Sequence, residues 1–429
     1  RKARKNNGAK RDMHYEMEEE EHVVYPDDPD FDINKARLFT TVPRICVRYE
    51  CVPMRFIKHV YKIHTYTQEG RLFEGKTPAS AFLNSSYDGS FIAGLMELRY
   101  IQSLPVERII NYFEGYGFTL KKPTAHKLIE KASSLFENLY KCIRQTALSD
   151  PYKAADETYY KILVPEKNSK GKGVRKGYLW VVVGINTRMI YLLYDDGSRS
   201  ERVILNELGG CKGIIQSDGY SPYRKLESDA YPNITRIPCL QHIKRKFIDC
   251  GEKDPDAKRI VELINALYQN EHKHKIGVEG WTVEQNLMHR KKYAPDILGE
   301  IKDVLDEIEE RGDLLPKSEL QEAITYLRNE WNAVVDIFNY GDTYLDNNMV
   351  ERMNRYISLS RKNSLFFGSH KGAERGAILY TIALTCRMHK VNLFEYLTDV
   401  INRTAEWQPN TPIEKYRELL PDRWEKAND

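Results

Sequence analysis

The segment from residue 154 to residue 238 has strand periodicity, and its order of elements limits the fold more than any other feature. Three strands are expected first, at residues 154–164, 178–185 and 189–194. Their short connections predict an antiparallel meander. A helix, a strand, a second helix and a last strand are expected next, at residues 200–208, 213–217, 221–226 and 234–238.

This order of elements is that of the ribonuclease-H-like fold, an α/β architecture. We expect the first part of that core over residues 151–250. Residues 251–340 have helical periodicity and little strand signal, so we expect an all-α insertion between Asp218 and Glu351. Residues 341–404 would complete the core with the helix that carries Glu351 and a long C-terminal helix over residues 373–404, and residues 405–429 form a tail. Element order alone does not give function.

The region before the core is expected to have three parts. Residues 1–39 hold a basic block and then an acidic block, as mobile charged arms do. Residues 40–89 are expected to be strand-rich, with a strand pair between residues 40 and 64. Residues 90–150 are expected to be helical, with helices at 91–103, 105–113 and 119–145. This helical part is compatible with helix-turn-helix DNA binding, and an ordinary helical hairpin explains the pattern equally well.

Composition and cysteine usage indicate an intracellular protein with a cytosolic location. The net charge is only +3, so whole-chain charge identifies no partner. The longest apolar run, residues 178–183, is too short to cross a membrane, and no signal peptide is visible. The seven cysteines lack a CxxC pair, which indicates reduced thiols. Cys46 and Cys51 could be half of a zinc site, but packed small residues are the better interpretation.

Three carboxylates fall where rigid elements can hold them. Asp156 lies in the first strand of the meander, Asp218 directly follows the short buried strand, and Glu351 lies in a helical segment. Two divalent ions about 3.5–4 Å apart, which promote phosphodiester chemistry, are bound by carboxylate oxygens. The three acids therefore predict a site for two Mg²⁺ or Mn²⁺ ions.

Each acid also has an interpretation that needs no metal. Asp218 and the glycine after it are a common turn pair. Asn348 and Glu351 have the spacing of a capping box, in which the glutamate closes back on the first amide of its helix. Asp156 could face solvent on an alternating strand. The long sequence separation of the acids does not decide between these interpretations.

Basic and amide residues gather near Glu351 and after the last expected strand. Lysine and arginine neutralise phosphates, and arginine does so with two parallel hydrogen bonds. We therefore expect a DNA-binding surface that contains Lys244, Arg245, Lys246, Arg352, Arg355, Arg361, Lys362, Asn363 and Lys371.

Several segments, in order, resemble the DDE transposases of the insertion sequence sixty-six family, the large TnpC-type proteins. The most specific is the run DNNMVER followed by RKNSLFFGS, at residues 346–352 and 361–369. Other matching segments are DET (156–158), SDGYSPY (217–223), IPCLQHIKRKF (237–247) and ELLPDRW (418–424). The resemblance covers roughly residues 40–425. The Cys-rich zinc-binding segment that is usual before the strand pair of this family is missing here. We therefore expect recognition of the element ends to be either reduced or carried by residues 106–132 and the basic arm.

The resemblance implies a ribonuclease-H-like catalytic core with a helical insertion. It places Asp156, Asp218 and Glu351 on the catalytic and metal-binding triad. Residues that would support the site are Cys239 and His242, which form a C-x-x-H motif, and Asn347 and Asn348. The implied partners are DNA at the element ends and at the target, a second copy or a larger assembly on DNA, and small accessory proteins encoded by the same element. The resemblance also implies a cytoplasmic bacterial protein that is associated with the nucleoid when bound to DNA, and it implies no membrane partner.

The leading hypothesis is therefore a DNA transposase of a bacterial insertion sequence that cleaves and transfers strands with metal ions. Two rivals remain. One is a catalytically silent DNA-binding protein derived from a transposase, and the other is a ribonuclease-H-type nuclease or resolvase that never joins its products to a target.

Overall fold

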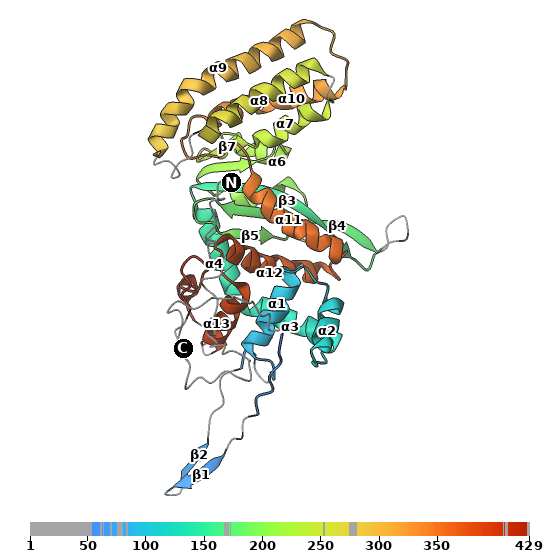
Figure 1. The fold of residues 1–429 in the computed structure, drawn as a ribbon, viewed down its shortest axis with the longest axis vertical. Coiled ribbons are helices and arrows are strands. Elements are labelled where there is room, and N and C mark those ends of the chain that lie inside the picture. Colours follow the sequence, from blue (N-terminus) through green and yellow to red (C-terminus); the bar gives the residue numbers. More distant parts are fainter. Residues whose placement is uncertain are drawn as a thin grey trace, which may run out of the picture. The chain divides into compact units, whose positions relative to one another are not determined.

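The computed structural model describes most of the chain after residue 53 (Figure 1). The described residues are 54–60, 62, 64–68, 71–74, 80–82, 85–166, 171, 173–251, 254–273, 281–405, 407 and 411–426. The charged arm expected over residues 1–39, Cys46 and Cys51 lie outside them. So does most of the strand pair expected between residues 40 and 64.

The first described strands form a short hairpin further along the chain than expected. Strand β1 (Thr65–Gln68) pairs with the antiparallel strand β2 (Arg71–Glu74). Residues 54–60, 62 and 64, which fall inside the expected pair, are not in a strand. Alternating apolar and polar residues therefore do not by themselves predict a strand in this segment. An extended segment that pairs with no other strand can have the same alternation.

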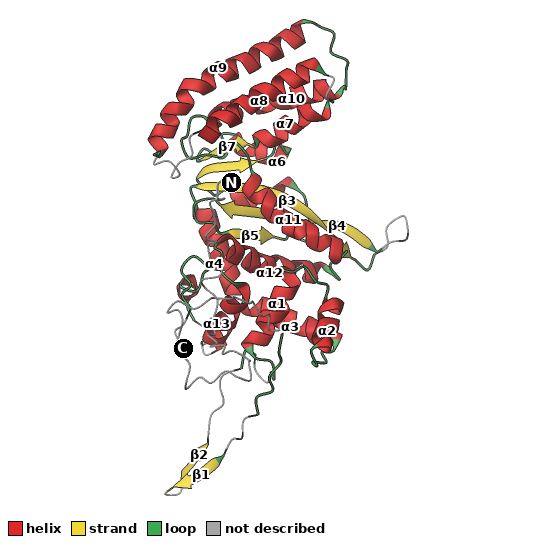
Figure 2. Cartoon of the chain, in the orientation of Figure 1, coloured by secondary structure: helices red, strands yellow, loops and turns green. Residues whose placement is uncertain are grey.

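A five-stranded mixed sheet occupies the centre of the fold (Figure 2). Its strands are β3 (Tyr152–Leu163), β4 (Val174–Gly184), β5 (Ile190–Leu193), β6 (Gly213–Ser217) and β7 (Ile234–Pro238). Their order across the sheet is β5-β4-β3-β6-β7. The first three strands pair antiparallel, which confirms the expected meander, and β6 and β7 join it in parallel.

Buried apolar residues explain why these strands form the core. In β4 the run from Leu179 to Val183 is completely buried, as is typical of a strand covered on both faces. The connection from β5 to β6 contains α5 (Glu201–Leu208), and the one from β6 to β7 contains α6 (Ser221–Arg224) and the 3₁₀ turn η1 (Lys225–Glu227). These crossovers make the parallel pairings possible.

A run of helices follows β7, as the sequence predicts. They are α7 (Leu240–Asp249), α8 (Pro255–Lys273), α9 (Val283–Glu310) and α10 (Glu319–Ile337). Helix α9 begins with a capping box between Thr282 and Gln285, and the Ser318 hydroxyl caps α10. Helix α10 contacts both α7 and β7, so this helical segment packs against one edge of the sheet.

The remaining helices precede the sheet or follow residue 347. Those before it are α1 (Gly89–Tyr100), α2 (Val106–Gly115), α3 (Lys122–Leu135) and α4 (Glu137–Ser149). Those after it are α11 (Asn348–Asn363), α12 (His370–Met388), α13 (Leu393–Ala405) and α14 (Ile413–Arg417). Helix α11 packs on β3 and β4, α12 packs on β5, and α1 packs on α13. None of the helices in the described part of the chain is long and apolar enough to cross a membrane.

Two helices predicted as continuous are interrupted. The helix expected over residues 119–145 is divided at Phe136, a fully buried side chain whose backbone leaves the helical conformation. The helix expected over residues 373–404 ends at Met388. Lys390 there takes a positive φ of 58°, and the Asn392 side chain caps the next helix at Glu395. A left-handed residue followed by a capping asparagine ends one helix and starts another.

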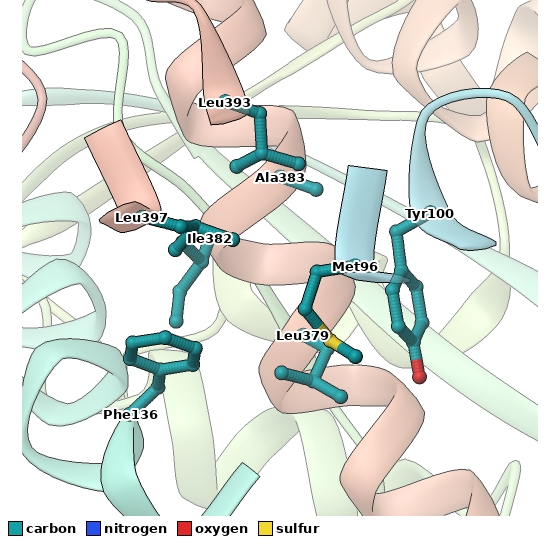
Figure 3. Close-up of a pocket in the computed structure, with 8 residues that line it drawn as sticks. All are labelled: Met96, Tyr100, Phe136, Leu379, Ile382, Ala383, Leu393 and Leu397. Carbon is teal, nitrogen blue, oxygen red and sulfur yellow. The ribbon is translucent and has the colours of Figure 1, made fainter. Parts of the chain in front are cut away.

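The packing of α1, α12 and α13 with Phe136, which lies between α3 and α4, leaves a small apolar gap (Figure 3). Its volume is about 10 Å³, close to the space that one water molecule needs. It is lined by Met96, Tyr100, Phe136, Leu379, Ile382, Ala383, Leu393 and Leu397. A gap of this size and polarity is a packing defect and does not bind a ligand.

Candidate active site

Neighbouring strands bring two of the predicted acids together. In the parallel pair of β3 and β6, Ala154 lies opposite Gln216. Asp156 and Asp218 each stand two residues further along, so they point to the same side of strands that are about 4.8 Å apart. Cys239 directly follows β7, the next parallel strand. Ligands of open α/β sheets bind at such carboxyl ends of parallel strands.

Asp156 is a half-buried carboxyl group held by two hydrogen bonds. Its Oδ2 accepts a hydrogen bond from Asn354 Nδ2 at 2.6 Å, and its Oδ1 accepts one from the backbone N–H of Glu157 at 2.8 Å. Burial, together with the negative charges of Glu157 and Asp218, raises the pKa of Asp156 to about 8. A carboxylate in this setting is stabilised by a nearby cation. The interpretation of Asp156 as a solvent-facing strand residue is therefore wrong.

The loop that carries Asp218 is fixed on several sides. Asp218 Oδ1 accepts a hydrogen bond from the Tyr220 N–H at 3.1 Å, as in a turn. The carbonyl of Asp218 accepts a hydrogen bond from Arg236 Nη1 at 3.2 Å, and the N–H of Gly219 donates one to the Tyr326 hydroxyl at 2.8 Å. A Cβ at Gly219 would lie 2.5 Å from that hydroxyl oxygen, so a larger residue would force the Tyr326 side chain to move.

Asn347 connects the start of α11 to two strands. Its side-chain Nδ2 donates a hydrogen bond to the Ala155 carbonyl at 3.0 Å, and its backbone N–H donates one to Cys239 Sγ at 3.2 Å. Helix α11 begins at Asn348, and its cap residue Asn347 makes no side-chain cap bond. The alternative in which Asn348 and Glu351 form a capping box is therefore wrong, and the Glu351 carboxylate is not used to close the helix.

Glu351 faces the C-x-x-H motif. Its Oε1 lies 3.7 Å from His242 Nδ1, and about a quarter of each side chain is exposed. One potential ligand atom from each of Cys239, His242 and Glu351 lies within 4.8 Å of the other two, and no other such group occurs among the described residues. Asp156 and Asp218 are not in this group. Burial raises the pKa of the Cys239 thiol to about 12, so without a metal it is neutral.

Several buried polar atoms around the acids have no hydrogen-bond partner. They are His242 Nδ1, Asn347 Oδ1, Glu351 Oε1 and Asn354 Oδ1. Buried polar atoms are normally satisfied by protein, ordered water or an ion. Asn347 and Asn354 contact Ala155 and Asp156, so their two free oxygens fit a hard divalent cation near Asp156. His242 Nδ1 and Glu351 Oε1 instead face each other beside the Cys239 thiol.

The predicted DNA-binding residues divide into an exposed group and a group with internal contacts. The exposed group consists of Arg245, Lys246, Arg352, Arg355, Lys362, Asn363 and Lys371. Arg361 is half-buried, stacks on the Tyr159 ring at 3.8 Å and donates a hydrogen bond to the Tyr159 carbonyl. Asn363 also donates a hydrogen bond to the Ser103 carbonyl, and Lys244 is half-buried near the Tyr268 ring.

Sequence reasoning missed two groups beside the acids. Asn354 lies one helical turn after Glu351, and that i, i+3 spacing is a signal that could have identified it. Glu157, next to Asp156, accepts a hydrogen bond from Arg199 Nε at 3.1 Å and lies 3.4 Å from the Tyr223 hydroxyl. No local pattern in the sequence relates Glu157 to Arg199.

This chain is similar to individual proteins and to one protein family. A chain from Sinorhizobium fredii (strain NBRC 101917 / NGR234), "Uncharacterized protein y4jD", is 25% identical over 370 residues, which cover 83% of this chain and 70% of that protein. A second from the same organism, "Uncharacterized protein y4hP", is 24% identical over 96% of this chain and 76% of its own length. The family described as "Transposase IS66 family" matches residues 84–375, which include all three acids, Cys239 and His242. The chain belongs to the IS66 family of transposases.

Proposed function

We propose that this transposase cleaves DNA strands at the ends of a mobile element and joins them to a target, with Asp156, Asp218 and Glu351 as its catalytic acids. The observation that carries the proposal is the arrangement of these acids. Asp156 on β3 and Asp218, directly after the parallel strand β6, both stand two residues past the paired Ala154 and Gln216. Asn354, one turn after Glu351 on α11, donates a hydrogen bond to Asp156.

The topology supports a ribonuclease-H-like core. Three antiparallel strands followed by two parallel ones, in the order β5-β4-β3-β6-β7, are what that fold requires. In this proposal the helices between residues 251 and 340 are an insertion between Asp218 and Glu351. Residues 151–250 and 341–404 together form the catalytic core.

The acids would hold two Mg²⁺ or Mn²⁺ ions. When bound, two such ions supply Lewis-acid stabilisation of the attacking and leaving oxygens of a phosphodiester. Asn354 fixes one oxygen of Asp156 by its hydrogen bond. Arg236 and Tyr326 fix the loop of Asp218 from β7 and α10, so the second carboxylate is positioned before a ligand arrives.

DNA would approach along the exposed basic residues next to the acids. Arg352 and Arg355 are exposed on the helix that carries Glu351, so they can contact phosphates close to the reacting bond. Because transposition pairs two element ends, we expect a dimer or larger assembly on DNA, together with accessory proteins encoded by the element. Helices α2 and α3 are the expected elements for recognition of the ends.

The experiment is strand cleavage of DNA that carries the ends flanking the gene, with Mg²⁺ or Mn²⁺ and the accessory proteins present. We expect Asp218→Asn to abolish cleavage and to keep binding of the ends. Asp229→Asn, a change of an exposed acid in the following loop, is the matched control and should cleave normally. Specific binding without cleavage by the unaltered protein would favour a silent DNA-binding protein, and cleavage without joining would favour a nuclease or resolvase.

A further inference from the structure

Cys239, His242 and Glu351 form a group of unlike donors at the edge of the proposed catalytic site. A thiol, an imidazole nitrogen and a carboxylate oxygen lie within 4.8 Å of one another. They come from the end of β7, the first turn of α7 and the first turn of α11. These elements are held together by the hydrogen bond from the Asn347 N–H to Cys239 Sγ, so the group does not depend on a flexible loop.

Two of the potential ligand atoms in this group have no hydrogen-bond partner in the described part of the protein. His242 Nδ1 and Glu351 Oε1 are buried and have no hydrogen-bond partner. Their separation of 3.7 Å is too long for a hydrogen bond between them. In a tetrahedral zinc site, a nitrogen and an oxygen about 2.0–2.2 Å from the ion are about 3.3–3.6 Å from each other. The observed separation of 3.7 Å is slightly longer than this, so a small movement of either side chain would bring both atoms to one ion.

The donor types indicate which ion would bind. A thiolate and an imidazole favour Zn²⁺ and related borderline-soft ions, whereas Mg²⁺ prefers oxygen ligands alone. Three protein ligands leave a fourth position for water or a substrate. The N–H groups that point at Cys239 Sγ would stabilise a thiolate, because a hydrogen bond to the charged form favours that form.

We propose that Cys239 Sγ, His242 Nδ1 and a Glu351 carboxylate oxygen bind a Zn²⁺-class ion, at a site separate from the Asp156 and Asp218 carboxylates. On binding, a metal–sulfur bond forms at Cys239, and the thiol proton is released to solvent. The site goes beyond the proposed strand chemistry and can be measured without DNA. One consequence rests on the proposed function. A Zn²⁺-class ion at this site would occupy the Glu351 carboxylate that strand cleavage needs, so the binding of Zn²⁺ would compete with the binding of Mg²⁺.

The experiment is a Co²⁺ titration of the full chain in buffer without Mg²⁺, followed by absorption spectroscopy. We expect about one Co²⁺ per chain and a thiolate-to-cobalt charge-transfer band, which Zn²⁺ removes and Mg²⁺ does not. Cys239→Ser should abolish the charge-transfer band. His242→Gln should weaken Co²⁺ binding by more than about 100-fold, which is more than the loss of a residue that only hydrogen-bonds to a metal ligand usually causes. Cys250→Ser, a change of a half-buried cysteine just past α7, is the matched control and should keep the band.

Three results would overturn the site: no charge-transfer band in the unaltered protein, a band that persists in Cys239→Ser, or equal displacement by Mg²⁺. Because His242 is partly exposed, His242→Gln should fold even if Cys239→Ser does not. Unchanged affinity in that variant would also contradict the ligand set. Circular dichroism of each variant establishes that the chain is folded before the titration.

Discussion

Replacing Arg236 by methionine should destabilise the protein by about 3 kcal/mol, because it leaves a buried glutamate without its partner. The side chains of Arg236 on β7 and Glu330 on α10 are both fully buried and form an ion pair. Burial raises the pKa of Glu330 and Arg236 lowers it, so removing the arginine leaves a charge that the interior disfavours. Loss of one partner of a buried pair costs about 3–5 kcal/mol. We expect the lower end, because Arg224 Nε remains 3.7 Å from Glu330.

The assay is urea unfolding followed by circular dichroism, with hydrogen exchange of the β7 and α10 amides to locate the change. The double variant Arg236→Met with Glu330→Leu should return to within about 1–2 kcal/mol of the unaltered protein, because apolar groups of similar volume replace buried pairs well. The reasoning is refuted if Arg236→Met alone costs less than about 1 kcal/mol. It is also refuted if the double variant costs as much as the two single changes added together.

Two further predictions concern the site and its DNA. Asn354→Ala should slow strand cleavage about 10-fold or more, since a hydrogen bond to a charged group contributes about 1.5–3 kcal/mol. Binding of the ends in a gel-shift assay should be unchanged, and an unaltered cleavage rate would show that Asn354 does not position Asp156. Changing both Arg352 and Arg355 to Gln should lower the slope of log affinity against log salt by about one for each arginine. Lys302→Gln on the exposed face of α9 should keep the original slope, and identical slopes in all variants would contradict phosphate contact.

The strands of the sheet could be predicted from sequence because their signals are local. An apolar run in β4 and short connections between the strands specify the meander without reference to the rest of the chain, although burial along β3 does not alternate. Strand β6 and the residue after it, Asp218, followed from a short apolar run that ends at a turn pair. The breaks at Phe136 and Lys390 could not be predicted in the same way, because tertiary packing and a left-handed residue interrupt sequences with good helical periodicity.

The parts of the site that could not be predicted depend on pairings between distant residues. Asn347 reaches the carbonyl of Ala155, which precedes it by 192 positions, and Arg236 reaches Glu330 across 94 positions. The convergence of Glu351 with Cys239 and His242 is of the same kind. The resemblance to a family identified the residues, whereas their hydrogen bonds come from the folded chain alone.

The most direct test of the central claim is to measure cleavage and joining by Asp156→Asn, Asp218→Asn and Glu351→Gln beside the unaltered protein. If the three acids form one site, each variant should lose at least about 1,000-fold in rate, since metal-assisted stabilisation supplies several kcal/mol. Each should still bind the ends. A variant that cleaves and joins at a rate close to that of the unaltered protein would contradict the claim. If Glu351→Gln were that variant, Glu351 would belong with Cys239 and His242 and not with the catalytic acids.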